Sequence, residues 1–169
     1  MLTIETGTGN PLATSYVTVA EATSYLTARG LDANWLDLTP TEQEQKLLRA
    51  MDYMAQAYRT RWRGWRSTTN QALDWPRQGV QLFDLPVAAV IQYNTMPVEV
   101  KNAQIELALR ALTVELAPDE QRGVLAESVT GVSVTYDPRS PQAVKFRAVD
   151  MMLRHLLASS GAMTPMGRA

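Results

Sequence analysis

Arginine and tryptophan residues alternate in one short stretch of the chain, which is the segment best suited to chemistry. The stretch and the residues that follow it contain Arg59, Arg61, Trp62, Arg63, Trp65, Arg66, Trp75 and Arg77. Guanidinium groups can follow the phosphates of a single-stranded nucleic acid while tryptophan rings stack on its bases. Two other interpretations stay open. The tryptophans could pack beneath a long loop with arginine stems across them, or the cluster could anchor a protein interface.

The remaining residues offer little for catalysis, so we expect no enzyme, no cofactor and no metal site. The chain has no cysteine and one histidine, so a zinc site would need several carboxylates. We expect His155 to lie in the last turn of a helix, where a partly protonated imidazole interacts well with the helix dipole. Gly7 and Gly9 lack the third glycine and the preceding strand of a phosphate-binding loop, and they predict an N-terminal turn.

Length and composition indicate one folded domain over residues 1–158 with a flexible tail over 159–169. The chain has 169 residues, of which 46% are hydrophobic and 20% charged. We expect no signal peptide and no membrane span, because the longest apolar run, residues 85–91, is short and contains Pro86. The net charge of -1 predicts no global attraction to nucleic acid, so binding would need a local patch.

Capping signals and periodicity predict four helices, which makes the fold mainly α. Thr18 with Glu21, and Thr39 with Glu42, have the spacing of helix-capping boxes, and Gly30 is suited to ending the first helix. The predicted helices cover residues 19–29, 40–59, 97–116 and 141–158. Alternating residues predict a small β-hairpin within 124–136, and residues 60–96 show no sustained period, so they are expected to form an irregular connection.

The third predicted helix is apolar around most of its circumference. One stripe contains Val100, Ala103, Leu107, Ala111 and Val114, and a second contains Ile105, Leu109, Leu112 and Leu116. A helix of this kind is buried on several sides, either by neighbouring helices or by a second subunit. We therefore predict a four-helix bundle with a hairpin between its third and fourth helices.

Several short segments in this order resemble a known family. They are SYVTVAEA at 15–22, LLRA at 47–50, WRGWR at 62–66, QALDWPR at 71–77, MPVEVKNA at 96–103, ELAL at 106–109 and VSVTY at 132–136. Together they resemble the head-to-tail adaptors of tailed bacteriophages, a group often labelled DnaT-like single-stranded-DNA-binding proteins. The resemblance covers residues 15–156, and residues 80–95 are more apolar than the family pattern.

This resemblance implies a structural protein of the virion neck that is in the host cytoplasm before assembly. It implies a ring, a dodecamer, formed by copies of this chain beneath the portal protein, with a neck or tail protein bound below and DNA passing through the centre without sequence-specific binding. The expected subunit or portal contacts are Ile105, Leu109, Leu112, Leu116, Met163, Met166 and Arg168. The alternative takes the DnaT-like label literally and makes the arginine and tryptophan cluster a single-stranded-DNA site. A third alternative is an unrelated helical scaffold.

Overall fold

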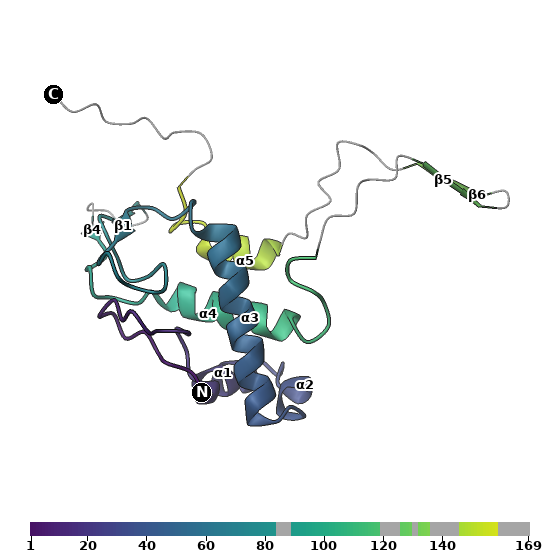
Figure 1. Ribbon diagram of the computed structural model, residues 1–169, viewed down its shortest axis with the longest axis horizontal. Helices are drawn as coiled ribbons and strands as arrows, with labels where there is room; N and C mark the ends of the chain where they lie inside the picture. Colours follow the sequence, from purple (N-terminus) through teal and green to yellow (C-terminus); the bar gives the residue numbers. More distant parts are fainter. Residues whose placement is uncertain (84–88, 119–125, 130–131, 136–145, 159–169) are drawn as a thin grey trace.

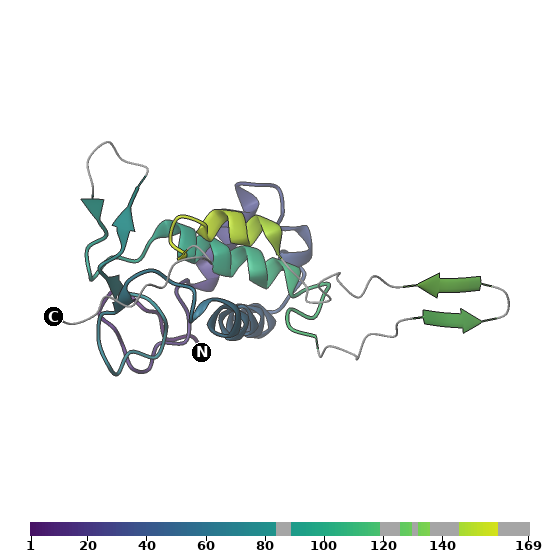
Figure 2. The same ribbon diagram turned by 90° about the horizontal axis from the view of Figure 1, so that it is seen from above.

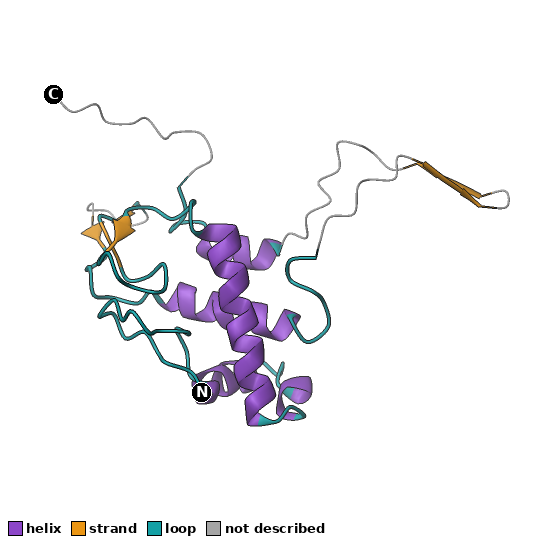
Figure 3. Cartoon of the chain, in the orientation of Figure 1, coloured by secondary structure: helices purple, strands orange, loops and turns teal. Residues whose placement is uncertain are grey.

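The computed structural model describes residues 1–83, 89–118, 126–129, 132–135 and 146–158. The helices in this part of the chain are α1 (Val19–Thr27), α2 (Ala33–Leu36), α3 (Pro40–Tyr58), α4 (Val98–Arg110) and α5 (Arg147–Leu153). They make the described structure mainly helical, as the sequence predicted (Figure 3). Among the described residues, no helix is both long and apolar enough to cross a membrane.

Both predicted capping boxes are present at the start of a helix. The Thr18 hydroxyl accepts the Glu21 N–H at 3.1 Å, and the Glu21 carboxylate accepts the Thr18 N–H at 2.7 Å. Thr39 and Glu42 make the same reciprocal pair at the start of α3. These bonds satisfy backbone donors that the first helical turn leaves without partners, so the sequence determines both helix starts locally.

The helix α4 is shorter than predicted, because it ends at Arg110 and not at Leu116. The N–H groups of Leu112 and Thr113 bond to carbonyls three residues earlier, so the last turn tightens before the chain leaves the helix. Leu116 is nevertheless buried. Its apolar side chain continues the pattern of the helix into a turn, which explains why periodicity alone overestimated the length.

The core lies where α3 crosses α4 and α5, which run side by side (Figures 1 and 2). Leu47 and Met54 of α3, Leu107 of α4 and Leu153 of α5 are fully buried there. Burying a side chain of this size stabilises a fold by about 1.5–3 kcal/mol. The four-helix bundle with a hairpin is not confirmed, because two of the described helices are only four and seven residues long.

A buried glutamine ties the N-terminal segment to this core. The side-chain amide of Gln104 donates to the Ser15 hydroxyl at 2.8 Å and to the Leu47 carbonyl at 3.1 Å, and its oxygen accepts the Tyr16 N–H at 2.9 Å. Gln104 is fully buried, so losing these partners would leave polar groups without water or protein bonds. One side chain thus connects α3, α4 and the segment that precedes α1.

Short antiparallel strand pairs lie within the segment expected to be irregular. The strand β1 (Trp65–Arg66) pairs with β2 (Arg77–Gln78), and β3 (Gln81–Leu82) pairs with β4 (Ala89–Val90). Strands of two residues are too short to show a period in the sequence, which explains why the prediction missed them. The segment also closes on the end of α5, because Trp62 forms an antiparallel bridge with Leu157.

The strands β5 (Ala126–Val129) and β6 (Val132–Thr135) pair with each other inside the range predicted for a hairpin. The predicted fourth helix is shorter than expected, since α5 begins at Arg147 and gives way to turns at Arg154. Residues 141–145 of that prediction lie outside the described residues, and so does the predicted tail, residues 159–169.

The turn around Gly7 and Gly9 encloses a carboxylate of the chain itself. Glu5 is fully buried, and its Oε1 accepts the N–H groups of Gly7, Thr8 and Gly9 at 2.8, 2.8 and 3.0 Å. Its Oε2 accepts the Asn10 N–H at 2.7 Å. Converging backbone N–H groups of this kind bind anions. Here the anion is supplied internally, so the turn has a structural role.

Candidate nucleic-acid interface

The buried side chain of Arg77 fixes the backbone of the arginine and tryptophan segment through hydrogen bonds. Its guanidinium donates to the carbonyl of Arg63 at 2.8 Å, to that of Gly64 at 2.6 Å and to that of Asp74 at 3.3 Å. The side chain is buried, and this burial lowers the pKa of Arg77 from its ordinary value. An arginine remains charged under these conditions, so the three carbonyls face a fixed cation.

Asp74 is the acidic centre of the same segment. Its carboxylate accepts the Arg59 Nε–H at 2.9 Å and the Trp62 Nε1–H at 3.3 Å, and the side chain is almost fully buried. Trp62 and Trp75 pack edge to face, with ring centroids 5.8 Å apart. These two tryptophans therefore belong to the interior, as does Arg77, and none of the three can reach a ligand on the surface.

Trp65 has the opposite environment, because two glycines bring its ring to the surface. Gly64 has a φ of +63°, and a Cβ there would lie 2.2 Å from the Gln78 carbonyl oxygen. A Cβ on Gly79 would lie 3.0 Å from the Trp65 ring, so the indole packs closely over the Gly79 backbone. The side chain is still 62% exposed. An indole supported on one side and open to solvent can stack on a planar partner.

Two more aromatic side chains are exposed in the same segment. Phe83, directly after β3, is 71% exposed, and Tyr93, after β4, is 65% exposed. The Ser67 hydroxyl, next to β1, donates to the Tyr93 carbonyl at 2.6 Å, which joins the chain after β4 to the first strand pair. The two strand pairs lie at one end of the molecule (Figure 1). We call Arg63, Trp65, Arg66, Phe83 and Tyr93 the arginine–aromatic surface.

The two arginines of this surface are positioned by neutral groups. Arg63 donates through Nε to the Leu157 carbonyl at 3.0 Å, and its guanidinium lies 4.8 Å from the centroid of the Phe83 ring. Arg66 donates to the Gln71 carbonyl at 3.2 Å. Neither forms an ion pair with a carboxylate among the described residues. Carbonyl bonds orient a guanidinium without cancelling its charge, so both can still attract an anion.

The two remaining arginines of the predicted cluster form ion pairs with acidic side chains. Arg59 pairs with Asp74, and Arg61 lies 3.6 Å from Asp150 of α5. The sequence motif therefore separates into buried residues, ion-paired residues and the exposed group around Trp65. Phe83 and Tyr93 were missed, although the unusually apolar composition of residues 80–95 was a signal that could have identified them.

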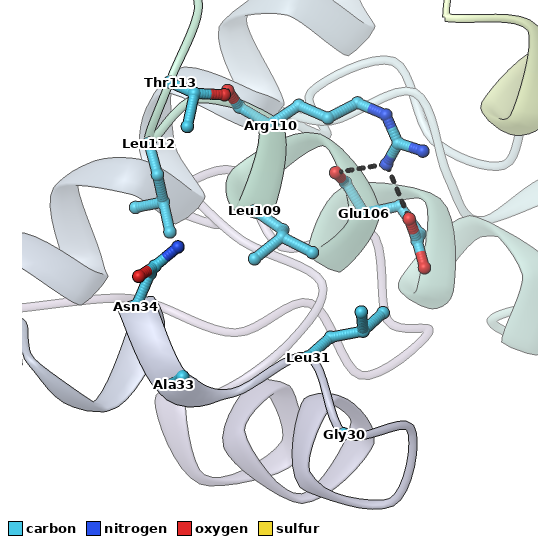
Figure 4. Close-up of a pocket in the computed structure, with 9 residues that line it drawn as sticks. All are labelled: Gly30, Leu31, Ala33, Asn34, Glu106, Leu109, Arg110, Leu112 and Thr113. Carbon is cyan, nitrogen blue, oxygen red and sulfur yellow. Dashed lines mark hydrogen bonds and ion pairs between the residues drawn. The ribbon is translucent and has the colours of Figure 1, made fainter.

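Residues predicted to contact a second subunit or a portal lie in different places. Ile105 is 2% exposed and Leu116 is 3% exposed, so both belong to the core of the chain itself. Leu109 and Leu112 are half-buried and line an open pocket of about 510 Å³ with Leu31 (Figure 4). An ion pair between Glu106 and Arg110 lies at its edge. Met163, Met166 and Arg168 lie outside the described residues.

His155 lies just beyond α5 and not in its last turn. Its Nε2 is 3.6 Å from a carboxylate oxygen of Glu99 in the first turn of α4. Within the described part of the chain, no group of three or more histidine, cysteine, aspartate or glutamate side chains is arranged to hold a metal ion.

The sequence model of one protein family matches the whole chain, residues 1–169, and is described as "Putative DnaT-like ssDNA binding protein". The chain belongs to this DnaT-like family. Comparisons with curated proteins and with solved structures found no significant match.

Membership of the DnaT-like family corrects the expectation of a phage head-to-tail adaptor. The family description concerns single-stranded DNA and gives no link to a portal, a neck or a virion, so the adaptor interpretation is wrong. Its main physical premise holds only in part, because Leu109 and Leu112 of the second apolar stripe line an open pocket while Ile105 and Leu116 belong to the core of the chain itself. Ile105 is buried inside the chain, and α1, α3 and α5 all pack against α4.

Proposed function

We propose that the chain is a non-enzymatic single-stranded-DNA-binding module and that the arginine–aromatic surface is its binding site. The observation that carries the proposal is the exposed indole of Trp65, in a segment where Arg63 and Arg66 supply charge and Arg63 contacts the exposed ring of Phe83. The Trp65 indole is exposed on one side and packs against the Gly79 backbone on the other. Neither Arg63 nor Arg66 is paired with a carboxylate among the described residues. The family description supports the same ligand.

Each part of the surface has a physical role in this proposal. Trp65, Phe83 and Tyr93 offer exposed rings on which unpaired bases can stack, an interaction worth roughly 1–3 kcal/mol for each base. Arg63 and Arg66 supply the cations that attract phosphates. Bases in a duplex are already stacked and paired, so the surface should prefer a single strand over a duplex of equal length.

The direct test is fluorescence anisotropy with a labelled oligothymidine, measured over a range of salt concentrations. Neutralising two phosphates of a single strand should give a log-log slope near -1.4, or about -0.7 for each contact. Trp65→Ala should weaken binding roughly 5- to 150-fold, because about 1–3 kcal/mol of stacking is lost. Arg66→Gln should weaken binding and make the slope shallower by about 0.7.

The matched control is Arg29→Gln, which removes the same charge from an exposed arginine after α1. In Figure 1, α1 lies at the bottom of the helical part, apart from β1 and β4 at its upper left. This variant should bind like the wild type. Wild-type protein that binds no oligonucleotide at low salt, or Trp65→Ala protein that binds as tightly as the control, would contradict the proposal.

Tryptophan fluorescence gives an independent readout. Trp35, Trp62 and Trp75 are buried, so quenching by a stacked base should come from Trp65. Trp65→Phe should remove the quenching while keeping part of the binding, because a phenyl ring still stacks. Quenching that survives this substitution would place the base-stacking site elsewhere.

A further inference from the structure

The outer face of α5 carries two arginines that the proposed site does not use. Arg147 and Arg154 are seven residues apart, which places them on one side of the helix, with Met151 between them. All three side chains are exposed, while Val149 and Leu153 on the opposite side are fully buried. Neither arginine forms an ion pair with a carboxylate among the described residues.

Asp150 is the acidic residue of α5, and its carboxylate is engaged elsewhere. It accepts the Tyr58 hydroxyl at 3.0 Å and lies 3.6 Å from the Arg61 guanidinium. Burial and the nearby Asp150 carboxylate raise the pKa of Tyr58, so its hydroxyl keeps the donated proton. Because Arg61 and Tyr58 occupy this carboxylate, the arginines on either side of it retain an outward positive charge.

The backbone connects this helix directly to the arginine–aromatic surface. The Arg63 N–H donates to the Leu156 carbonyl at 3.0 Å, and the Ala158 N–H donates to the Arg61 carbonyl at 2.7 Å. Trp62 is buried between these two bonds, whereas Arg61 is exposed and Arg63 is half-buried. In Figure 1, α5 runs from this junction away from β1 and β4.

We infer that the phosphate backbone of a bound single strand continues from Arg63 past Arg61 onto the outer face of α5, where Arg154 and Arg147 contact it. This inference rests on the proposed function and extends its site. Electrostatic complementarity carries it, because two exposed arginines without carboxylate partners follow the proposed site along connected backbone. Met151 offers an adaptable apolar contact for a base between the two cations.

Helix stability does not explain both arginines. A cation near the C-terminus of a helix interacts favourably with the helix dipole, so Arg154 also stabilises α5. Arg147 is the first residue of the helix, where the same dipole disfavours a positive charge. Its presence on the exposed face therefore fits a role in binding an anionic partner.

The test uses the full-length double variant Arg147→Gln/Arg154→Gln with two oligothymidines, one of four and one of sixteen nucleotides. The control is Arg29→Gln/Arg49→Gln, which removes the same charge from the exposed Arg29 and from the half-buried Arg49, an ion-pair partner of Glu115, both outside the proposed path. The α5 variant should bind the longer strand at least tenfold more weakly than the control variant does. Its log-log slope of affinity against salt concentration should be shallower by about 1.4, because two phosphate contacts are lost. The shorter strand should bind both variants within twofold.

The other outcomes are decisive against the extended path. If the α5 variant binds both strands like the control, the path does not cross α5, and the proposed function stands. If both strands lose affinity equally, α5 contributes to the primary contact or to folding and does not extend the path. Wild-type protein that binds neither strand would overturn the proposed function together with this inference.

Discussion

Replacing Arg77 with lysine tests how much the buried hydrogen bonds of Arg77 contribute to the free energy of unfolding. The substitution keeps the positive charge but cannot preserve a fork that reaches three carbonyls, those of Arg63, Gly64 and Asp74. Hydrogen bonds from a charged donor contribute about 1.5–3 kcal/mol each. A lysine ammonium can keep one of the two shorter bonds, and the third is long at 3.3 Å. We therefore expect Arg77→Lys to lower the free energy of unfolding by about 2–4 kcal/mol.

Urea denaturation followed by circular dichroism measures this change, provided that the transition is two-state. Arg66→Lys is the matched control, because Arg66 is exposed and makes one carbonyl bond of 3.2 Å. It should change stability by less than about 1 kcal/mol. An Arg77→Lys protein within about 0.5 kcal/mol of the wild type, with an unchanged dependence on urea, would refute the reasoning.

Four further substitutions test other parts of the fold. Trp75→Ala should destabilise the protein by roughly 3–5 kcal/mol in urea, because Trp75 is fully buried; a change below about 1 kcal/mol would contradict this burial. Ile105→Asp should prevent folding at 25 °C, whereas Leu112→Asp at the half-exposed pocket should leave a folded protein by circular dichroism. Burial raises the pKa of Glu21, but hydrogen bonds from Thr18 and Lys101 outweigh it, and the net pKa lies below its ordinary value. A carboxylate with a lowered pKa stabilises the fold above its unfolded-state pKa, so Glu21→Gln should lower the melting temperature at pH 7 but not at about pH 2.

The sequence predicted the starts of α1 and α3 well because their determinants are local, whereas α2 was not predicted and α5 begins later than expected. The pairs Thr18 with Glu21 and Thr39 with Glu42 act within one turn, and the structure contains both. Helix ends were less predictable. Apolar residues such as Leu116 stay buried after the helical hydrogen bonds have stopped, so a buried side chain does not by itself indicate a helical backbone.

The candidate site was predictable in composition but not in geometry. The arginine and tryptophan cluster was found from the sequence, yet Trp62 and Trp75 are buried while Trp65 is exposed. This sorting depends on the contact of Trp65 with Gly79 and on the pairing of Trp62 with Leu157. Contacts across such sequence distances leave no local signal, so burial could not be assigned before the fold was known.

The near-zero net charge does not argue against the proposed ligand, because local charges decide the field at the site. The net charge of -1 predicted no global attraction to nucleic acid, so that binding would need a local patch. Salt screens charges beyond about 8 Å at physiological ionic strength, so carboxylates at the far end of the molecule have little influence on a phosphate beside Arg66. Between residues 59 and 96 arginines outnumber aspartates, and that segment contains no lysine or glutamate. The electrostatic field at the proposed site therefore depends on its own arginines. It depends in particular on which of them already form an ion pair with a carboxylate.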